Sequence, residues 1–133
     1  GDDLPKEKIK RVVLCSGKVY YDLKKARDEK GISDVALLRL EQLYPFPYFE
    51  VEEMLKGYSD AEEFVWAQEE PRNQGAWFSH RHRLERVLEK LKIKNSFKPI
   101  TRPPAAAPAV GLMKLHLQQQ QELVDNVLKR DMK

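Results

Sequence analysis

The sequence predicts an α/β domain of three layers, in which helices cover both faces of a mostly parallel sheet of four or five strands. Two observations support this prediction. Short apolar runs alternate with longer segments of helical periodicity along nearly the whole chain. Several of these runs are apolar at consecutive positions, as in parallel strands that are buried on both faces. With 133 residues, of which 41% are apolar, the chain has the length of one domain.

The start of the chain predicts a boundary. Residues 1–10 are polar and include Pro5, so we expect a linker or tail there. Residues 11–133 are then expected to form the domain. Because the sequence begins with Gly1 and not with Met, we also expect a piece of a longer protein, cut at this linker.

A strand and a helix should open the domain. Residues 11–15 are almost continuously apolar, which predicts a buried strand, and residues 18–30 have a helical period. Ser16 between them is expected to cap the helix, and Gly17 to allow the tight turn. Gly31 is expected to end the helix.

The middle of the chain repeats this order. We predict a strand at residues 35–40, a short helix at 48–56 and a strand at 63–67. The polar residues 68–76 should form a loop, and residues 76–91 have apolar positions at helical spacing.

The last part is less regular. Residues 97–101 are expected to be a strand, and Pro99 restricts it to an edge or an end of the sheet. The Pro- and Ala-rich residues 102–111 should be extended against a surface, and residues 112–129 should form an amphipathic helix. This alternation requires crossover connections and therefore parallel strands.

The loop after the third predicted strand is the most unusual stretch of the chain. Ligands approach parallel sheets at the carboxyl ends of the strands, where this loop should lie. Neighbouring carboxylates without a nearby nucleophile or metal ligand are more typical of an interface than of catalysis. Trp66 and Trp77 flank the loop and are expected to anchor it by burial. We predict a dimer-interface loop whose contact residues are Gln68, Glu69, Glu70, Asn73, Gln74 and Trp77.

Charge and composition exclude several classes of protein. The 24 Lys and Arg residues are interspersed with 21 Asp and Glu residues, which argues against a nucleic-acid-binding arm. Cys15 is the one cysteine, so no intrachain disulfide can form, and we expect it to be buried as a small apolar residue. No apolar run approaches the roughly 20 residues of a membrane span. His80 and His82 point in different directions on a helix, so a basic surface turn is expected and not a metal site; for His116 we expect a structural role.

A second hypothesis keeps a binding function for the strand ends. Residues 16–18 lack the length and the glycines of a phosphate-binding loop, which favours a simple turn. A free-standing module that binds a nucleotide or coenzyme A for regulation nevertheless stays open as an alternative, and a structural adaptor that self-associates is a third. The contacts of such a regulatory ligand would be Ser16, Lys18, Gln42 and Arg102.

Five blocks of sequence resemble one family. They occur in the family's order and, with His116 and Gln120, span most of the chain. Together they are similar to the C-terminal domain of the E1 component of 2-oxoglutarate dehydrogenases. The blocks are residues 12–23, 39–47, 68–71, 73–77 and 102–111.

This resemblance implies a function that composition does not. Such E1 enzymes use thiamine diphosphate and Mg²⁺ to decarboxylate 2-oxoglutarate, and they transfer the succinyl group to the lipoyl arm of the E2 succinyltransferase in the citric acid cycle. The domain would have the transketolase C-terminal fold, with one antiparallel edge strand, and would support the homodimer. The full-length enzyme would lie in a bacterial cytoplasm or the mitochondrial matrix.

The same resemblance assigns no chemistry to this chain. In the family, the cofactor, the metal and the catalytic histidines belong to the preceding domains. We therefore expect no catalytic, cofactor-binding or metal-binding residue in this chain. The chain should be inactive alone. The E1 of 2-oxoadipate dehydrogenase shares these blocks, so the substrate stays open between the two 2-oxo acids.

Two departures from the family pattern stand out. In the branch that acetyl-CoA activates, basic residues follow the Pro-x-Pro, whereas this chain has Tyr48-Phe49-Glu50. The departure argues against acetyl-CoA regulation. The family's last block usually has Tyr-x-Gly-Arg, of which Arg102 alone is present.

Overall fold

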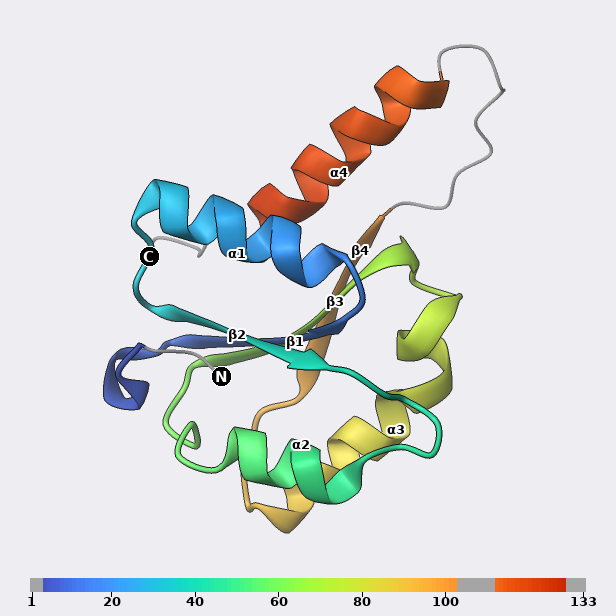
Figure 1. Cartoon of the computed structure of the whole chain (residues 1–133). Helices are drawn as coiled ribbons and strands as arrows, with labels where there is room; N and C mark the ends of the chain where they lie inside the picture. Colours follow the sequence, from blue (N-terminus) through green and yellow to red (C-terminus); the bar gives the residue numbers. More distant parts are fainter. Residues whose placement is uncertain (1–3, 103–111, 129–133) are drawn as a thin grey trace.

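The computed structural model of the chain describes residues 4–102 and 112–128 (Figure 1). A short 3₁₀ helix, η1, precedes four strands and four α-helices. In order they are η1 (Lys6–Lys8), β1 (Arg11–Ser16), α1 (Val19–Lys30), β2 (Val35–Leu40), α2 (Tyr48–Leu55), β3 (Glu63–Pro71), α3 (Gly75–Lys90), β4 (Phe97–Arg102) and α4 (Leu112–Leu128).

The four strands form one sheet in the order β2-β1-β3-β4, and every neighbouring pair is parallel. This confirms the predicted fold class. The antiparallel edge strand that the family resemblance implies does not occur within residues 4–102 and 112–128. β1 is central: the chain leaves it toward β2 on one side and returns to β3 on the other. The winding therefore reverses between β1 and β3, the point at which ligands usually bind to such sheets.

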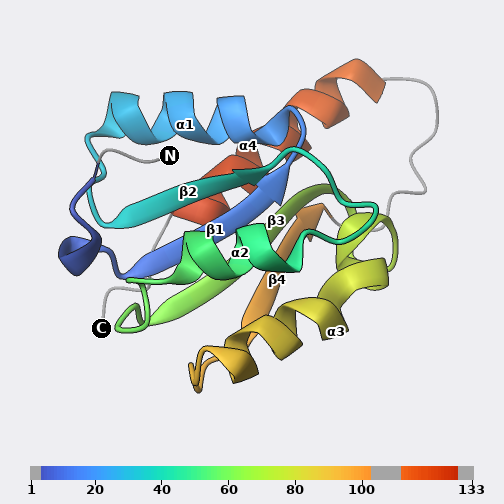
Figure 2. The ribbon, with the colours of Figure 1, turned by 60° about the horizontal axis from the view of Figure 1, so that its bottom comes forward.

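Two apolar layers enclose the sheet. α2 and α3 cover one face, and α1 and α4 cover the other (Figure 2). Successive residues of β1 alternate between the layers, since Val12 and Leu14 belong to the first and Val13 and Cys15 to the second. The consecutive apolar residues of the sequence thus mark a strand that is buried on both faces.

β3 is longer than the sequence predicts. The polar residues from Gln68 to Pro71 continue the strand, and Pro71 pairs with Arg102 of β4 after an irregularity in the register. The prediction of a loop over residues 68–76 is therefore wrong for its first half. Polar residues at the end of a strand resemble a loop when burial is not known, because their partners come from other elements.

The first turn also differs in part from the prediction. Gly17 has a φ of 78°, so it does allow the tight turn. Ser16, however, is the last residue of β1, and the cap of α1 is Lys18, whose side chain makes no capping hydrogen bond. Gly31 ends α1 as predicted, with a φ of 67° and its N–H donated to the carbonyls of Arg27 and Asp28.

The segment before β1 contacts the domain. Ile9 is buried in the layer of α2 and α3. The ammonium group of Lys6 donates to the carbonyl of Lys56 at 3.2 Å and lies 5.2 Å from the ring centre of Tyr58. Its stem lies where a side chain on Gly57 would be, since a Cβ there would be 2.9 Å from Lys6 Cδ. Residues 4–10 are thus fixed along the end of α2.

β4 lies at an edge of the sheet, as Pro99 requires. The Pro- and Ala-rich segment falls mostly outside the described residues. Within residues 4–102 and 112–128, we find no helix that has both the length and the apolar character for a membrane crossing.

Candidate functional site

A cleft of about 560 Å³ opens at the carboxyl ends of β1 and β3. It lies at the point where the winding of the sheet reverses. Its walls come from four segments that are distant in the sequence: the β1–α1 turn, the loop after β2, the end of β3 and the start of α3. The polar residues that line it are Ser16, Lys18, Gln68, Glu69, Glu70 and Ser79.

Gln68 organises the turn between β3 and α3. Its side chain is 4% exposed. The amide oxygen accepts hydrogen bonds from the Trp66 indole N–H at 2.9 Å and from the Trp77 backbone N–H at 2.8 Å. The amide nitrogen donates to the carbonyls of Glu70, Pro71 and Gln74 at 3.1, 2.8 and 2.7 Å. One buried side chain therefore bonds to five groups at the end of β3 and the start of α3, and of these the Pro71 carbonyl also accepts from the Gln74 backbone N–H at 2.9 Å.

Gly75 lets this turn close. It has a φ of 67°, and a Cβ there would lie 3.0 Å from the Glu70 carboxylate and 3.2 Å from the Gln68 amide oxygen. A side chain at this position would strain the backbone and displace both polar groups. The turn is therefore rigid, and the carboxylates of Glu69 and Glu70 are held at the cleft.

The six residues predicted as dimer contacts lie at the end of β3, in the turn and at the start of α3, and they differ in accessibility. Gln68 and Trp77 are buried and support the turn from inside, and Trp66 is buried beside them. Glu69 is half-buried, whereas the side chains of Glu70, Asn73 and Gln74 are exposed. Of the predicted contact residues, these exposed or half-exposed ones are available to a partner.

The four residues predicted to contact a regulatory ligand do not share one site. Ser16 and Lys18 line the cleft, but the exposed Gln42 does not. Arg102 forms an ion pair with Glu69 at 3.6 Å and donates a hydrogen bond to Gln120 of α4. Gln120 in turn donates to Asp22 of α1 at 2.8 Å, so that Arg102 joins β4 to both helices of its layer. The structure therefore brings two of the four residues together.

His80 lies in the core and not on a basic surface turn, which corrects the sequence prediction. It is 3% exposed, whereas His82 is exposed. Its ring lies against those of Tyr44 and Phe46, at centroid distances of 4.9 and 5.3 Å. Its Nδ1 is 3.3 Å from an Arg83 nitrogen, and no described group bonds to its Nε2. Burial, with the nearby charges of Arg83 and His82, lowers the pKa of His80.

The sequence held a signal for this burial. His80 lies three residues after Trp77 and four before Leu84, both of which are buried on the same helix. It therefore belongs to the apolar stripe of α3. Arg81 and Arg83 make the segment look like a basic surface, and the apolar spacing is therefore easy to miss.

Cys15 is buried, as predicted. Burial raises the pKa of its thiol from 9.0 to about 12, against the opposing charge of Arg39. The thiolate that a nucleophile requires is therefore absent at neutral pH.

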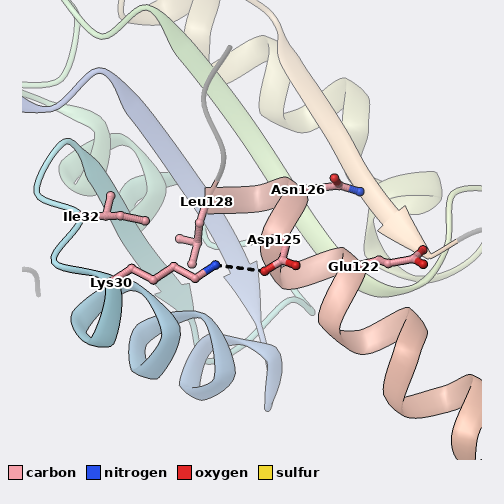
Figure 3. A pocket seen from close by; sticks show the side chains of 6 residues that line it. All are labelled: Lys30, Ile32, Glu122, Asp125, Asn126 and Leu128. Atoms are coloured by element: carbon pink, nitrogen blue, oxygen red, sulfur yellow. Dashed lines mark hydrogen bonds and ion pairs between the residues drawn. The ribbon is translucent and has the colours of Figure 1, made fainter. Parts of the chain in front are cut away.

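A second hollow, of about 590 Å³, lies at the opposite end of the sheet (Figure 3). Its residues come from the end of α1, from Ile32 and from the last turns of α4. Lys30 and Asp125 form an ion pair of 3.0 Å across it, and the Asp125 pKa is lowered by this contact. These groups hold α1 to α4, and they offer no reactive group.

Within 4–102 and 112–128, no three His, Cys, Asp or Glu residues are grouped closely enough to hold a metal ion.

Comparison with known proteins identifies the family of this chain. The family model described as 2-oxoglutarate dehydrogenase C-terminal matches residues 2–128. The chain belongs to this family. The resemblance seen in the sequence blocks is thereby confirmed.

Curated relatives agree with this result. The 2-oxoglutarate dehydrogenase E1 component of Haemophilus influenzae is 48% identical over 128 residues, which are 96% of this chain and 13% of the relative. Those of Azotobacter vinelandii and Coxiella burnetii are 44% and 47% identical over 94% and 92% of the chain, and again 13% of each relative. The chain thus spans 13% of the length of each of these relatives, or about an eighth.

Proposed function

We propose that this chain serves as the C-terminal domain of an E1 subunit that oxidatively decarboxylates 2-oxoglutarate and transfers the succinyl group to the lipoyl arm of E2. The match of residues 2–128 to the 2-oxoglutarate dehydrogenase C-terminal family carries this proposal. The relatives named above are all 2-oxoglutarate dehydrogenase E1 components, which favours this substrate over 2-oxoadipate.

The cofactors of this proposal are thiamine diphosphate and Mg²⁺. When bound, thiamine diphosphate supplies the carbanion-stabilising chemistry of decarboxylation. The family resemblance implies that both groups belong to the domains that precede this one. We therefore assign both groups to parts of E1 outside this chain and no step of the reaction to its residues.

The domain's own contribution is structural. The rigid turn around Gln68 presents Glu69, Glu70 and Asn73 at the carboxyl end of the sheet, where a second E1 subunit or a preceding domain would dock. We propose this turn as part of the homodimer contact and the surroundings of the active site. The assembled enzyme, with E2, would work in a bacterial cytoplasm or a mitochondrial matrix.

Three proteins test this proposal: the full-length E1, the same protein lacking residues 11–133, and the 133-residue chain alone. Each is given 2-oxoglutarate, thiamine diphosphate and Mg²⁺, and CO₂ release is measured, with 2-oxoadipate as the comparison substrate. We expect activity in the full-length protein only. CO₂ release by the isolated chain would refute the structural role, and preference for 2-oxoadipate would refute the substrate.

A further inference from the structure

Large apolar side chains that are strongly exposed occur at one end of this sheet. Within residues 4–102 and 117–128 they come from five different segments, and they are 59–73% exposed. We call them the carboxyl rim; they are Tyr21, Tyr44, Phe49, Phe78 and Leu117.

Each of them is placed there by the topology. Tyr21, Phe49 and Phe78 lie in the first turn of α1, α2 and α3, and each of these helices follows the carboxyl end of a strand. Tyr44 lies in the loop after β2. Figure 1 shows the helices starting at the side to which the strand arrows point, with the first half of α4 projecting beyond them.

Leu117 belongs to the same end because of the direction of α4. The guanidinium of Arg11, at the start of β1, donates to the carbonyls of Asn126 and Val127 in the last turn of α4. Gln120, one turn after Leu117, contacts Arg102 and Asp22 at the other end of the sheet. The rim residues therefore lie at the carboxyl end of the sheet and come from helices on both of its faces, and Tyr44 among them lines the cleft.

Two of the rim rings are held in place by neighbours. The Tyr44 ring lies 4.9 Å from that of the buried His80. The Tyr21 ring packs edge-on against Tyr20 at 5.3 Å, and the Arg39 guanidinium lies 5.4 Å from its centre. Such aromatic side chains lose little conformational entropy on binding, which is typical of the anchors of protein interfaces.

We propose that the carboxyl rim is the surface on which this domain packs against the remainder of the E1 polypeptide. This rests on the proposed function. The curated relatives are about eight times longer than this chain, which covers 13% of their length, so most of such a protein is available to cover the rim. Folded proteins rarely leave large contiguous apolar surface in water, and a cluster of exposed apolar side chains at one end of a sheet is typical of a contact surface.

The charges at this end of the sheet favour one kind of partner surface. Glu69 and Glu70 line the cleft together with Lys18, and Glu69 is half-buried and paired with Arg102 at 3.6 Å. The exposed Glu70 is therefore the cleft carboxylate most accessible to a partner. An apolar surface of the remaining E1 chain, with a basic side chain opposite Glu70, fits this end of the domain.

Footprinting with hydroxyl radicals tests coverage of the rim. Full-length E1 and the 133-residue chain are oxidised briefly, and the rates at single residues are read by mass spectrometry. Phe78 is 65% exposed here. In full-length E1 we expect its oxidation rate to fall about tenfold, as for a side chain that becomes as buried as Trp77, which is 6% exposed. Equal rates at Tyr44 and Phe78 in both proteins would overturn the proposal.

Cross-linking with a carbodiimide identifies the occupant. In full-length E1, Glu70 should couple to a lysine outside residues 1–133, and the product should disappear in Glu70→Gln. Coupling of Glu70 to residues 1–133 of a second copy would overturn the choice of occupant. If the rim is protected while the protein does not decarboxylate 2-oxoglutarate, the proposed function fails and the packing surface stands.

A pair of variants completes the test. Tyr44→Asp/Phe78→Asp should release the domain to limited proteolysis in full-length E1. The control Lys8→Asp/Lys94→Asp adds the same two acidic residues, with a larger change of net charge, at exposed positions on the opposite end of the sheet. Equal resistance to proteolysis in both variants would contradict a docked rim.

Discussion

The two ends of this sheet differ in how their side chains are paired and exposed, although the same four strands form both. At the amino end, a largely buried ion pair and an exposed one close the structure: Arg11 binds Glu63 at 2.9 Å, and Lys30 binds Asp125 at 3.0 Å. At the carboxyl end, the turn around Gln68 forms one wall of an open cleft, and the exposed side chains of the carboxyl rim lie at the same end. At the amino end, the charged groups find their partners within the described residues. At the carboxyl end, exposed apolar side chains form the surface that we propose contacts the rest of E1.

The largest expected effect comes from breaking the closed end at Arg11. This side chain is 2% exposed, and it donates to Glu63, Asn126 and Val127. Arg11→Ala should lower the free energy of unfolding by about 3 kcal/mol, because it removes the buried partner of the Glu63 carboxylate and the donor to two carbonyls in the last turn of α4. Urea unfolding of the chain measures this.

The control for Arg11 is Lys98, which bonds to the same Glu63 from an exposed position at 3.4 Å. Lys98→Ala should cost less than about 1 kcal/mol, as exposed ion pairs do. Similar losses in both variants would show that burial does not distinguish the two partners.

A smaller loss is expected when the turn at the open end is broken. Gln68→Leu keeps the size of the side chain but leaves the Trp66 and Trp77 N–H groups unpaired. We expect a loss of about 2–3 kcal/mol in urea unfolding, from the cost of unsatisfied buried donors. Gln74→Leu, at an exposed position of the same turn, should change stability by about 0.5 kcal/mol at most. Equal stabilities of the two variants would rule out this role for Gln68.

The smallest effect is a pH dependence from His80 beneath the open end. The pKa of His80 in the folded chain lies below its ordinary 6.5, because burial opposes the charge. The unfolded chain therefore takes up the proton first, so stability should fall as the pH drops below about 6.5 and level off below the folded pKa. Thermal unfolding between pH 8 and pH 5, in His80→Phe against the parent chain, measures this.

The groups that face His80 define the control. Arg83 and His82 belong to the same helix, and the rings of Tyr44 and Phe46 come from the loop after β2. His82→Phe should keep the pH dependence, since His82 is exposed. If His80→Phe retains the dependence as well, another group is responsible.

The sequence predicted the interior well and the surface poorly. The apolar runs of β1, β2 and β3 and the glycine at the end of α1 act locally, so spacing alone located them. The polar end of β3 did not follow from spacing, because Gln68 gains its partners from a turn and from Trp77 nine residues away. His80 was misplaced for a related reason, since its burial depends on a loop from another part of the chain.

The candidate site was predictable only in part. The sequence located the turn after β3, and the buried tryptophans beside it are as expected. It did not reveal the cleft, which needs four segments to meet, or the separation of Gln42 from Ser16 and Lys18. The rim could not be predicted, because exposure of an aromatic residue depends on which way its helix faces.

The outer strands have a consequence for assembly. At one border of the sheet, Pro99 in β4 has no N–H to donate, and at the other the buried guanidinium of Arg27 occupies the carbonyl of Val35 in β2. Neither border is a good template for strand addition. Copies of this domain are therefore expected to associate through helices and turns, without a sheet that continues from one subunit into the next.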